Sequence, residues 1–164
     1  MSSRTARSAR LPLYLGGLMG PFGTVVIIPM FPELRETFDA SSAAVSWGFT
    51  IYMLPFAAML LVSGTLGERW GRRRSVRSAF LLFAIASLFC ALAPNLAVFL
   101  VGRTLQGVAN AFITPLLFAG LAEVVKPSAF GRSVGIYSSF WAAGGALAPV
   151  VGGFFSLIHI SEPT

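Results

Sequence analysis

The chain has 164 residues, of which 55% are hydrophobic and 11% are charged. An ordinary soluble domain has about 45 to 50% apolar and about 25% charged residues, so this composition predicts a membrane protein. The net charge of +6 would suit nucleic acid if the cations shared one face of a soluble domain, but they lie between apolar runs. The single cysteine, Cys90, excludes a disulfide framework and leaves no metal-ligand spacing. We expect neither a metal nor a cofactor.

The amino-terminal part of the chain predicts two spanning helices. Residues 1–10 carry three arginines among serine and threonine and should form a short cytoplasmic tail. The apolar run at about 11–32 is longer than a signal-peptide core of about 7 to 15 residues, so it predicts a first span, bent at Pro21. The polar segment from Phe31 to Ser42 should form an outer loop, and a second span follows at about 43–63.

The densest charge lies from Gly64 to Arg74, GTLGERWGRRR, between two apolar runs. Glu68 stands four residues before Arg72, the favourable order for an ion pair on a helix. The stretch resembles the loop signature of the major facilitator superfamily of secondary transporters, Gly-x-Leu-Ala-Asp-Arg-x-Gly-Arg-Arg/Lys. The matching positions are Gly64, Leu66, Arg69, Gly71, Arg72 and Arg73, while Gly67 and Glu68 replace Ala and Asp. A basic loop in an unrelated polytopic protein would explain the charge but not the spaced glycines.

Three more apolar runs predict spans at about 76–93, 96–125 and 133–157. The shortest has about 18 residues, just enough at 1.5 Å per residue to cross a core of about 30 Å. The predicted fold class is all-α, a polytopic membrane helix bundle of about five transmembrane helices over residues 11–157. Ten of the twelve Lys and Arg residues fall in the tail, in the basic hinge at 64–77 and in the connection between the last two spans. The positive-inside rule therefore places the amino terminus in the cytoplasm of a cell-membrane protein.

One polar stripe runs along the fourth span. Arg103, Gln106 and Asn110 lie at three- and four-residue steps and share a helix face. An arginine at a helix centre costs on the order of 3 kcal/mol on insertion scales, so we expect this face to line an inner cavity. Through Arg103, Gln106, Gly107, Ala111 and Pro115, the segment resembles the superfamily signature Arg-x-x-Gln-Gly-x-x-x-Ala with a downstream Pro. The resemblance implies proton coupling; a purely structural arginine, bonded to backbone carbonyls, remains the alternative.

Small residues recur in the last span and predict close helix packing. The expected packing positions are Gly107, Gly144, Ala148, Pro149, Gly152 and Gly153. The segment GGALAPVVGG resembles the antiporter signature Gly-x-x-x-Gly-Pro-x-x-Gly-Gly, except for Ala148 at the second Gly. Generic close packing would explain the same pattern.

We also expect a charge cluster at the cytoplasmic end. Glu68 and Glu123 lie at the inner ends of two spans and bracket Arg72. In the superfamily the equivalent acid and arginine are thought to latch the two halves together. The resemblance therefore implies a cytoplasmic gate made of Gly64, Glu68, Arg69, Arg72, Arg73 and Glu123. Its partner would lie in a second half, which leaves the surface at Gly64 uncovered.

Together the signatures imply a secondary transporter that exports a small, drug-like molecule in exchange for protons by alternating access. Trp47, Thr50 and Tyr52 are similar to the drug:proton antiporter branch, but Gly23 stands where many fourteen-helix members carry Asp, and no predicted span has a central carboxylate. A membrane fragment without transport activity, or a facilitator-type symporter or uniporter, remains an alternative. An intramembrane enzyme is disfavoured, because LVSG at 61–64 lacks the first Gly of a rhomboid-type GxSG.

Superfamily members have twelve or fourteen spans in six-helix halves. We therefore expect an amino-terminal part of a longer transporter, whose partners are a small-molecule substrate, protons, the lipid bilayer and the carboxy-terminal half. The last nine residues, SLIHISEPT at 156–164, resemble a translated sequencing adapter. We expect the native sequence to end near Phe155 and 156–164 to be a non-native tail.

Overall fold

The computed structural model describes residues 3–160 and the side chains of residues 10–154. Within that part every regular element is a helix, in the order α1 (Ser3–Val25), η1 (Ile28–Met30), α2 (Phe31–Thr37), α3 (Ser42–Arg69), α4 (Arg72–Ala91), α5 (Leu96–Val124), η2 (Pro127–Ala129) and α6 (Phe130–Ile160). The stretches of the described chain that are long and apolar enough to cross a membrane number five: Arg10–Thr37, Ser42–Arg69, Arg72–Ala91, Leu96–Val124 and Pro127–Phe154. The predicted all-α bundle of about five spans is confirmed.

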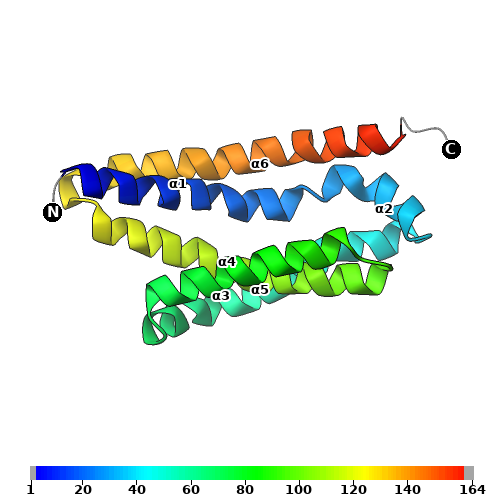
Figure 1. The fold of residues 1–164 in the computed structure, drawn as a ribbon, viewed down its shortest axis with the longest axis horizontal. Coiled ribbons are helices and arrows are strands. Elements are labelled where there is room, and N and C mark those ends of the chain that lie inside the picture. The colour runs from blue at the N-terminus through cyan, green and yellow to red at the C-terminus, as the bar shows by residue number, and fades with distance from the viewer. Residues whose placement is uncertain (1–2, 161–164) are drawn as a thin grey trace.

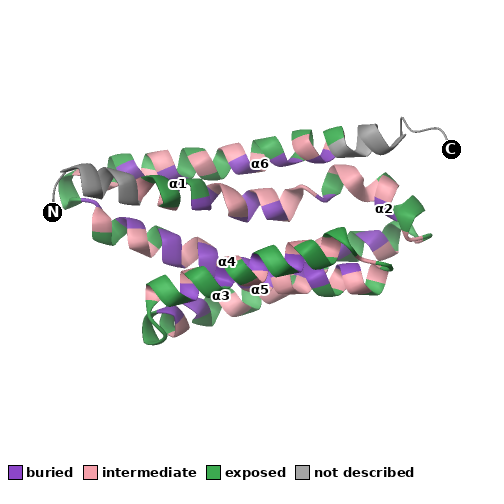
Figure 2. Cartoon of the chain, viewed as in Figure 1, coloured by how far each residue is buried: buried purple, intermediate pink, exposed green. Residues whose placement is uncertain are grey.

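Helix α5 is the central element of the bundle. It packs against α3 and α4 and also against α1, while α6 lies alongside α1 (Figure 1). Half of the most apolar stretch of α5 is buried, against 17 to 33% in the other spans. The outer faces of α4 and α6 are exposed (Figure 2), and they carry large apolar side chains such as Leu81 and Val150. Such faces suit contact with lipid.

The two ends of the bundle differ in charge. The start of α1, the α3–α4 turn and the α5–α6 connection lie at one end, on the left in Figure 1, and α2 and the α4–α5 turn lie at the other. The first end holds the arginines at 69, 72, 73, 74 and 77 together with Lys126 and Arg132. The second holds Glu33, Glu36 and Asp39.

Local chemistry explains where several helices begin. The Ser41 hydroxyl accepts a hydrogen bond from the Ala44 amide at 3.2 Å, and the Asn95 side chain accepts one from the Val98 amide at 3.0 Å. Both satisfy amides that an N-terminal helical turn otherwise leaves unpaired. Between α3 and α4, Gly71 has φ +87°, a conformation that glycine adopts without strain. The chain can therefore reverse over Trp70 and Gly71 alone.

The first span differs from the expected helix at 11–32. Helix α1 begins at Ser3, so most of the expected tail is helical. Helix α1 continues through Pro21 and ends at Val25, and the chain then continues through η1 into α2, where a loop was expected. Prolines stand in the first turns of η1 and α2, where the missing N–H removes no helical hydrogen bond. Each proline therefore starts a short new helix.

The other helices also run past the predicted spans. Helix α3 continues to Arg69 and α4 starts at Arg72, so the basic hinge is mostly helical. Hydropathy marks only the apolar part of a helix, whereas backbone hydrogen bonds continue into polar sequence. Helix α6 runs from Phe130 to Ile160 and includes the first residues of the expected non-native tail. The side chains of that tail lie outside the described residues.

Three glycines allow main chains to approach closely. A Cβ at Gly107 would overlap the Tyr52 carbonyl of α3. Likewise, a Cβ at Gly144 or Gly152 of α6 would overlap carbonyl oxygens of the segment from Leu18 to Val26. These contacts set the α5–α3 and α6–α1 spacings, as small residues do in membrane bundles.

Only part of the predicted small-residue set in α6 belongs to its packing face. Ala148 is fully buried and lies about one turn from both Gly144 and Gly152. Pro149 is exposed, and no described atom lies within 4 Å of a Cβ built at Gly153. Pro149 follows Ala148, and Gly153 follows Gly152. One residue turns a helix by about 100°, so both point away from the face that packs on α1. These two positions therefore lie outside the packing face that the described residues form, and their packing role stays a prediction.

Candidate functional site

The Arg103 side chain joins three helices inside the bundle. It is 3% exposed. Its Nε donates to the Gly48 carbonyl of α3 at 3.1 Å, and its Nη1 donates to the Gly23 carbonyl of α1 at 2.9 Å and to Gln106 Oε1 at 2.8 Å. The guanidinium lies 4.4 Å from the centroid of the Tyr52 ring, a cation–π distance. The arginine is thus shielded from lipid by protein groups on α1, α3 and α5.

Two groups of hydrogen-bonded polar residues lie along α5 beside this arginine. Gln106 is 7% exposed and donates through Nε2 to the Ser87 hydroxyl of α4 at 2.9 Å. Asn110 is 2% exposed, and its Oδ1 accepts a hydrogen bond from the Thr114 hydroxyl at 3.2 Å. The Tyr137 hydroxyl of α6 donates to the Thr114 carbonyl at 3.4 Å. The polar stripe of α5 therefore contacts its neighbours rather than the outer surface.

Arg103 and Gln106 also line a cavity of about 610 Å³. Its walls come from the α1–α2 region, α4 and α5, and its polar lining consists of Glu33, Thr37, Ser87, Cys90, Arg103 and Gln106. The Nη2 of Arg103 is buried and makes no hydrogen bond to any described residue. Asn110 lies deeper in the bundle, beside Gly20, and is not among the lining residues.

Glu33 is a cavity residue that the sequence did not predict. It was expected in an outer loop, whereas it lies on α2, partly buried and on the wall of the cavity that Arg103 lines. A signal was present, because Phe31, Leu34 and Phe38 stand at i, i+3 and i+7, a spacing typical of one apolar helix face. Leu34 is indeed buried, with the two phenylalanines packed around it.

At the basic end of the bundle, one ion pair joins α4 to α5. Arg72 Nη1 lies 2.5 Å from Glu123 Oε1, with side chains 23% and 66% exposed. Arg72 thus sits at the C-terminal end of α5, where the helix dipole favours a cation. Arg10 lies at the same end and donates through Nη2 to the Val124 carbonyl at 3.5 Å.

The remaining predicted gate residues do not join this pair. Glu68 is exposed and makes no ion pair with a described side chain. It lies in the last turn of α3, whereas Arg72 begins α4, so the chain reversal removes the four-residue helical spacing expected of the two. Arg69 and Arg73 are exposed as well, and a Cβ at Gly64 would have no described atom within 4 Å.

The five long apolar helices and the buried, hydrogen-bonded arginine beside a cavity define a polytopic membrane protein of the transporter class. The profile of the Major Facilitator Superfamily matches residues 13–161. The chain therefore belongs to this superfamily, whose members are transporters and not enzymes.

Known relatives are similar over much of this chain. It is 32% identical over 162 residues to the MFS-type transporter YvkA of Bacillus subtilis. The matched residues are 99% of this chain and 36% of the relative. It is 33% identical over 139 residues to the MFS antiporter QDR3 of Candida albicans, or 85% of this chain and 20% of the relative. The drug efflux pump JefA of Mycobacterium tuberculosis is 35% identical over 123 residues, or 74% of this chain and 24% of the pump. The matched region is thus 20 to 36% of each relative's length.

Proposed function

We propose that this chain is the amino-terminal part of a transporter that exports a small, drug-like molecule in exchange for protons by alternating access. The observation that carries the proposal is the Arg103 centre, a buried cation held by three helices on the wall of a cavity of about 610 Å³. Relatives named as an antiporter and a drug efflux pump support the direction of transport and the substrate class.

The cavity can serve both partners of such an exchange. Arg103 brings positive charge to the cavity wall, and Glu33 brings a carboxylate to the same cavity. A carboxylate that gains and loses a proton there would change the field felt by a substrate and by Arg103. We therefore propose Glu33 as a proton-exchanging group and Arg103, with Gln106, as the group that orients substrate. In this scheme Asn110 supports the centre from one turn deeper.

We propose the orientation with the amino terminus in the cytoplasm of a cell-membrane protein. The basic ends of α3, α4 and α6 gather at the end of the bundle where α1 starts, and the acidic residues of α2 lie at the other end. Positive charge is retained on the cytoplasmic side of membrane proteins. The Arg72–Glu123 pair then lies at the cytoplasmic end, where a gate between two halves would close.

We do not propose that these 164 residues transport on their own. The matched region spans only 20 to 36% of the relatives, and alternating access needs two parts that move against each other. The natural subject of the functional test is the complete transporter that contains this sequence.

The test measures transport by that complete transporter in proteoliposomes. A panel of fluorescent drug-like molecules is supplied outside the vesicles, and a pH-sensitive dye inside them reports proton movement. We expect Arg103→Ala and Arg103→Lys each to reduce export at least about tenfold, because neither substitute reproduces the forked donor geometry. Arg35→Ala is the matched control, since Arg35 is an exposed cation on α2 and does not line the cavity. Export by Arg103→Ala at the parental rate would reject the proposal. Substrate movement without proton movement would favour the uniporter alternative.

A further inference from the structure

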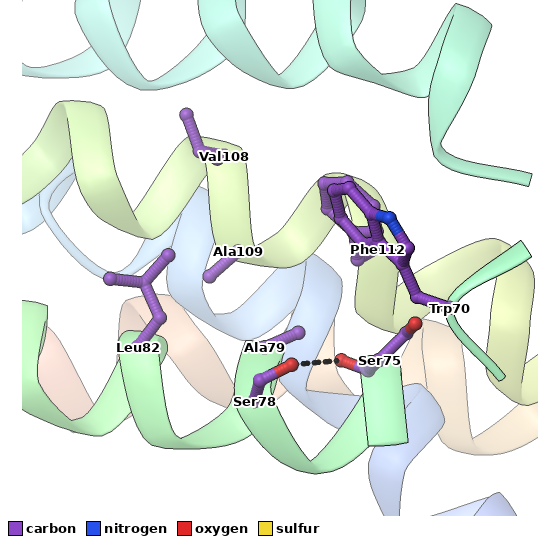
Figure 3. Close-up of a pocket in the computed structure, with 8 residues that line it drawn as sticks. All are labelled: Trp70, Ser75, Ser78, Ala79, Leu82, Val108, Ala109 and Phe112. Atoms are coloured by element: carbon purple, nitrogen blue, oxygen red, sulfur yellow. Dashed lines mark hydrogen bonds between the residues drawn. The ribbon is translucent and has the colours of Figure 1, made fainter. Parts of the chain in front are cut away.

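A second candidate site lies on the outside of the bundle, beside the α3–α4 turn. Three adjoining depressions there share the Ser78 side chain. One, of about 160 Å³, lies between α4 and α5 (Figure 3). The other two, of about 480 Å³ each, are bordered by arginines. None of the residues that line them lines the Arg103 cavity.

The small depression is an apolar slot with a polar edge. Leu82 and Ala79 of α4 and Val108 and Ala109 of α5 form its floor, and the Phe112 ring closes one end (Figure 3). The Trp70 indole lies over Phe112, with ring centroids 6.2 Å apart and planes inclined by 13°. Ser75 and Ser78 supply the polar edge.

The two larger depressions carry uncompensated positive charge. Arg69 and Arg74 line one, and Arg73, Arg74 and Arg77 line the other. None of these four makes an ion pair with a described carboxylate, including the nearby Glu68. Helix α4 also has no acidic residue in its first turn and no side-chain cap. Cations beside the positive end of a helix are unfavourable, so an anion bound here would relieve their repulsion.

The arrangement matches the boundary between lipid headgroups and acyl chains. Trp70 is 59% exposed and lies between two spanning helices, a position that suits an interfacial indole. From Ser75 to Leu82 the slot extends about 10 Å along α4 at 1.5 Å per residue. The arginines therefore stand at headgroup level, and the slot runs toward the depth of acyl chains.

We propose that this surface binds one acidic phospholipid of the adjacent leaflet. Its phosphate lies between Arg74 and Arg69, with Ser78 at the polar edge, and one acyl chain enters the slot between α4 and α5. Basic pockets beside spanning helices bind anionic headgroups, and the apolar slot selects a lipid over a free phosphate. The proposal does not depend on the transported substrate or on its coupling to protons.

Tryptophan quenching in nanodiscs tests this site on the 164-residue chain. Trp47→Phe and Trp141→Phe, both at exposed positions, leave Trp70 as the sole tryptophan. We expect brominated phosphatidylglycerol, diluted in phosphatidylcholine, to quench Trp70 more strongly than brominated phosphatidylcholine at equal mole fraction. Equal quenching by the two lipids would overturn the proposal.

Two kinds of variant separate the headgroup from the chain. Arg74→Gln with Arg69→Gln should reduce the preference for phosphatidylglycerol about fivefold per arginine, because a basic residue at an anionic surface contributes about 1 kcal/mol. Arg35→Gln, at the opposite end of the bundle, should leave it unchanged. Val108→Phe should fill the slot and lower quenching while the arginines remain. Three results would each contradict the site. The preference for phosphatidylglycerol could survive the double arginine variant, Val108→Phe could leave the quenching unchanged, or inorganic phosphate could displace the lipid.

Discussion

At the residue scale, the contacts of Arg103 bear on the two roles, structural and coupling, that its sequence context left open. Two of its hydrogen bonds go to backbone carbonyls of α1 and α3, as a structural arginine would make. A third goes to Gln106, and Nη2 is buried without a hydrogen-bond partner among the described residues. The helices therefore hold the guanidinium in place, and its role in coupling stays a prediction.

Glu33 gives the residue-scale prediction. In the complete transporter, Glu33→Gln should abolish substrate-driven proton movement while leaving the protein folded, because the amide keeps the shape of the side chain and cannot ionise. Glu36→Gln is the matched control, an exposed acid on the same helix that does not line the cavity. The measurement is the internal pH change in proteoliposomes on addition of substrate. Normal proton movement in Glu33→Gln would assign coupling to another group.

At the element scale, the contact between α1 and α6 depends on which face of α6 a glycine occupies. Gly144 meets the main chain of α1, whereas Gly153 meets no described atom within 4 Å of a Cβ position. The two glycines belong to the same helix and differ mainly in this contact.

We expect opposite effects from the same substitution at these two sites. Gly144→Ala should lower the free energy of unfolding by about 1 to 3 kcal/mol, since overpacking forces backbone shifts. Gly153→Ala should be neutral or stabilising by about 0.5 to 1 kcal/mol, the gain in helix propensity. Ala148→Gly should cost about 1 kcal/mol, a mild loss. Denaturant titration in detergent measures all three, and equal destabilisation by the two Gly→Ala changes would reject the assigned packing face.

At the scale of the whole molecule, the charged end of the bundle is held by a surface ion pair rather than by a buried cluster. Arg72 and Glu123 are 23% and 66% exposed, and such a pair contributes only about 0 to 1 kcal/mol. That is too little to determine the fold. It is enough to change the ratio of two conformations up to about fivefold.

For the complete transporter we predict that Arg72→Ala shifts the population toward the cytoplasm-open state and weakens export, with little loss of folded protein. Arg73→Ala is the matched control, because Arg73 is the next residue of α4, is exposed and makes no ion pair with a described side chain. Distances between spin labels on the two halves measure the population. If Arg72→Ala and Arg73→Ala give the same distance distribution as the parent, the pair is no latch.

Sequence by itself determined the number and type of the spans, the basic end of the bundle and the polar face of α5, because these follow from hydropathy and helical period along one continuous segment. Tertiary structure decided which groups meet. The carbonyls that hold Arg103 lie 55 and 80 residues away along the chain. Glu33 reaches the cavity because η1 and α2 extend the first span. The sequence predicted Arg72 near both Glu68 and Glu123, and the reversal at Gly71 leaves only the pair with Glu123 among the described residues. Local spacing cannot predict such pairings, because they depend on how closely separate helices pack.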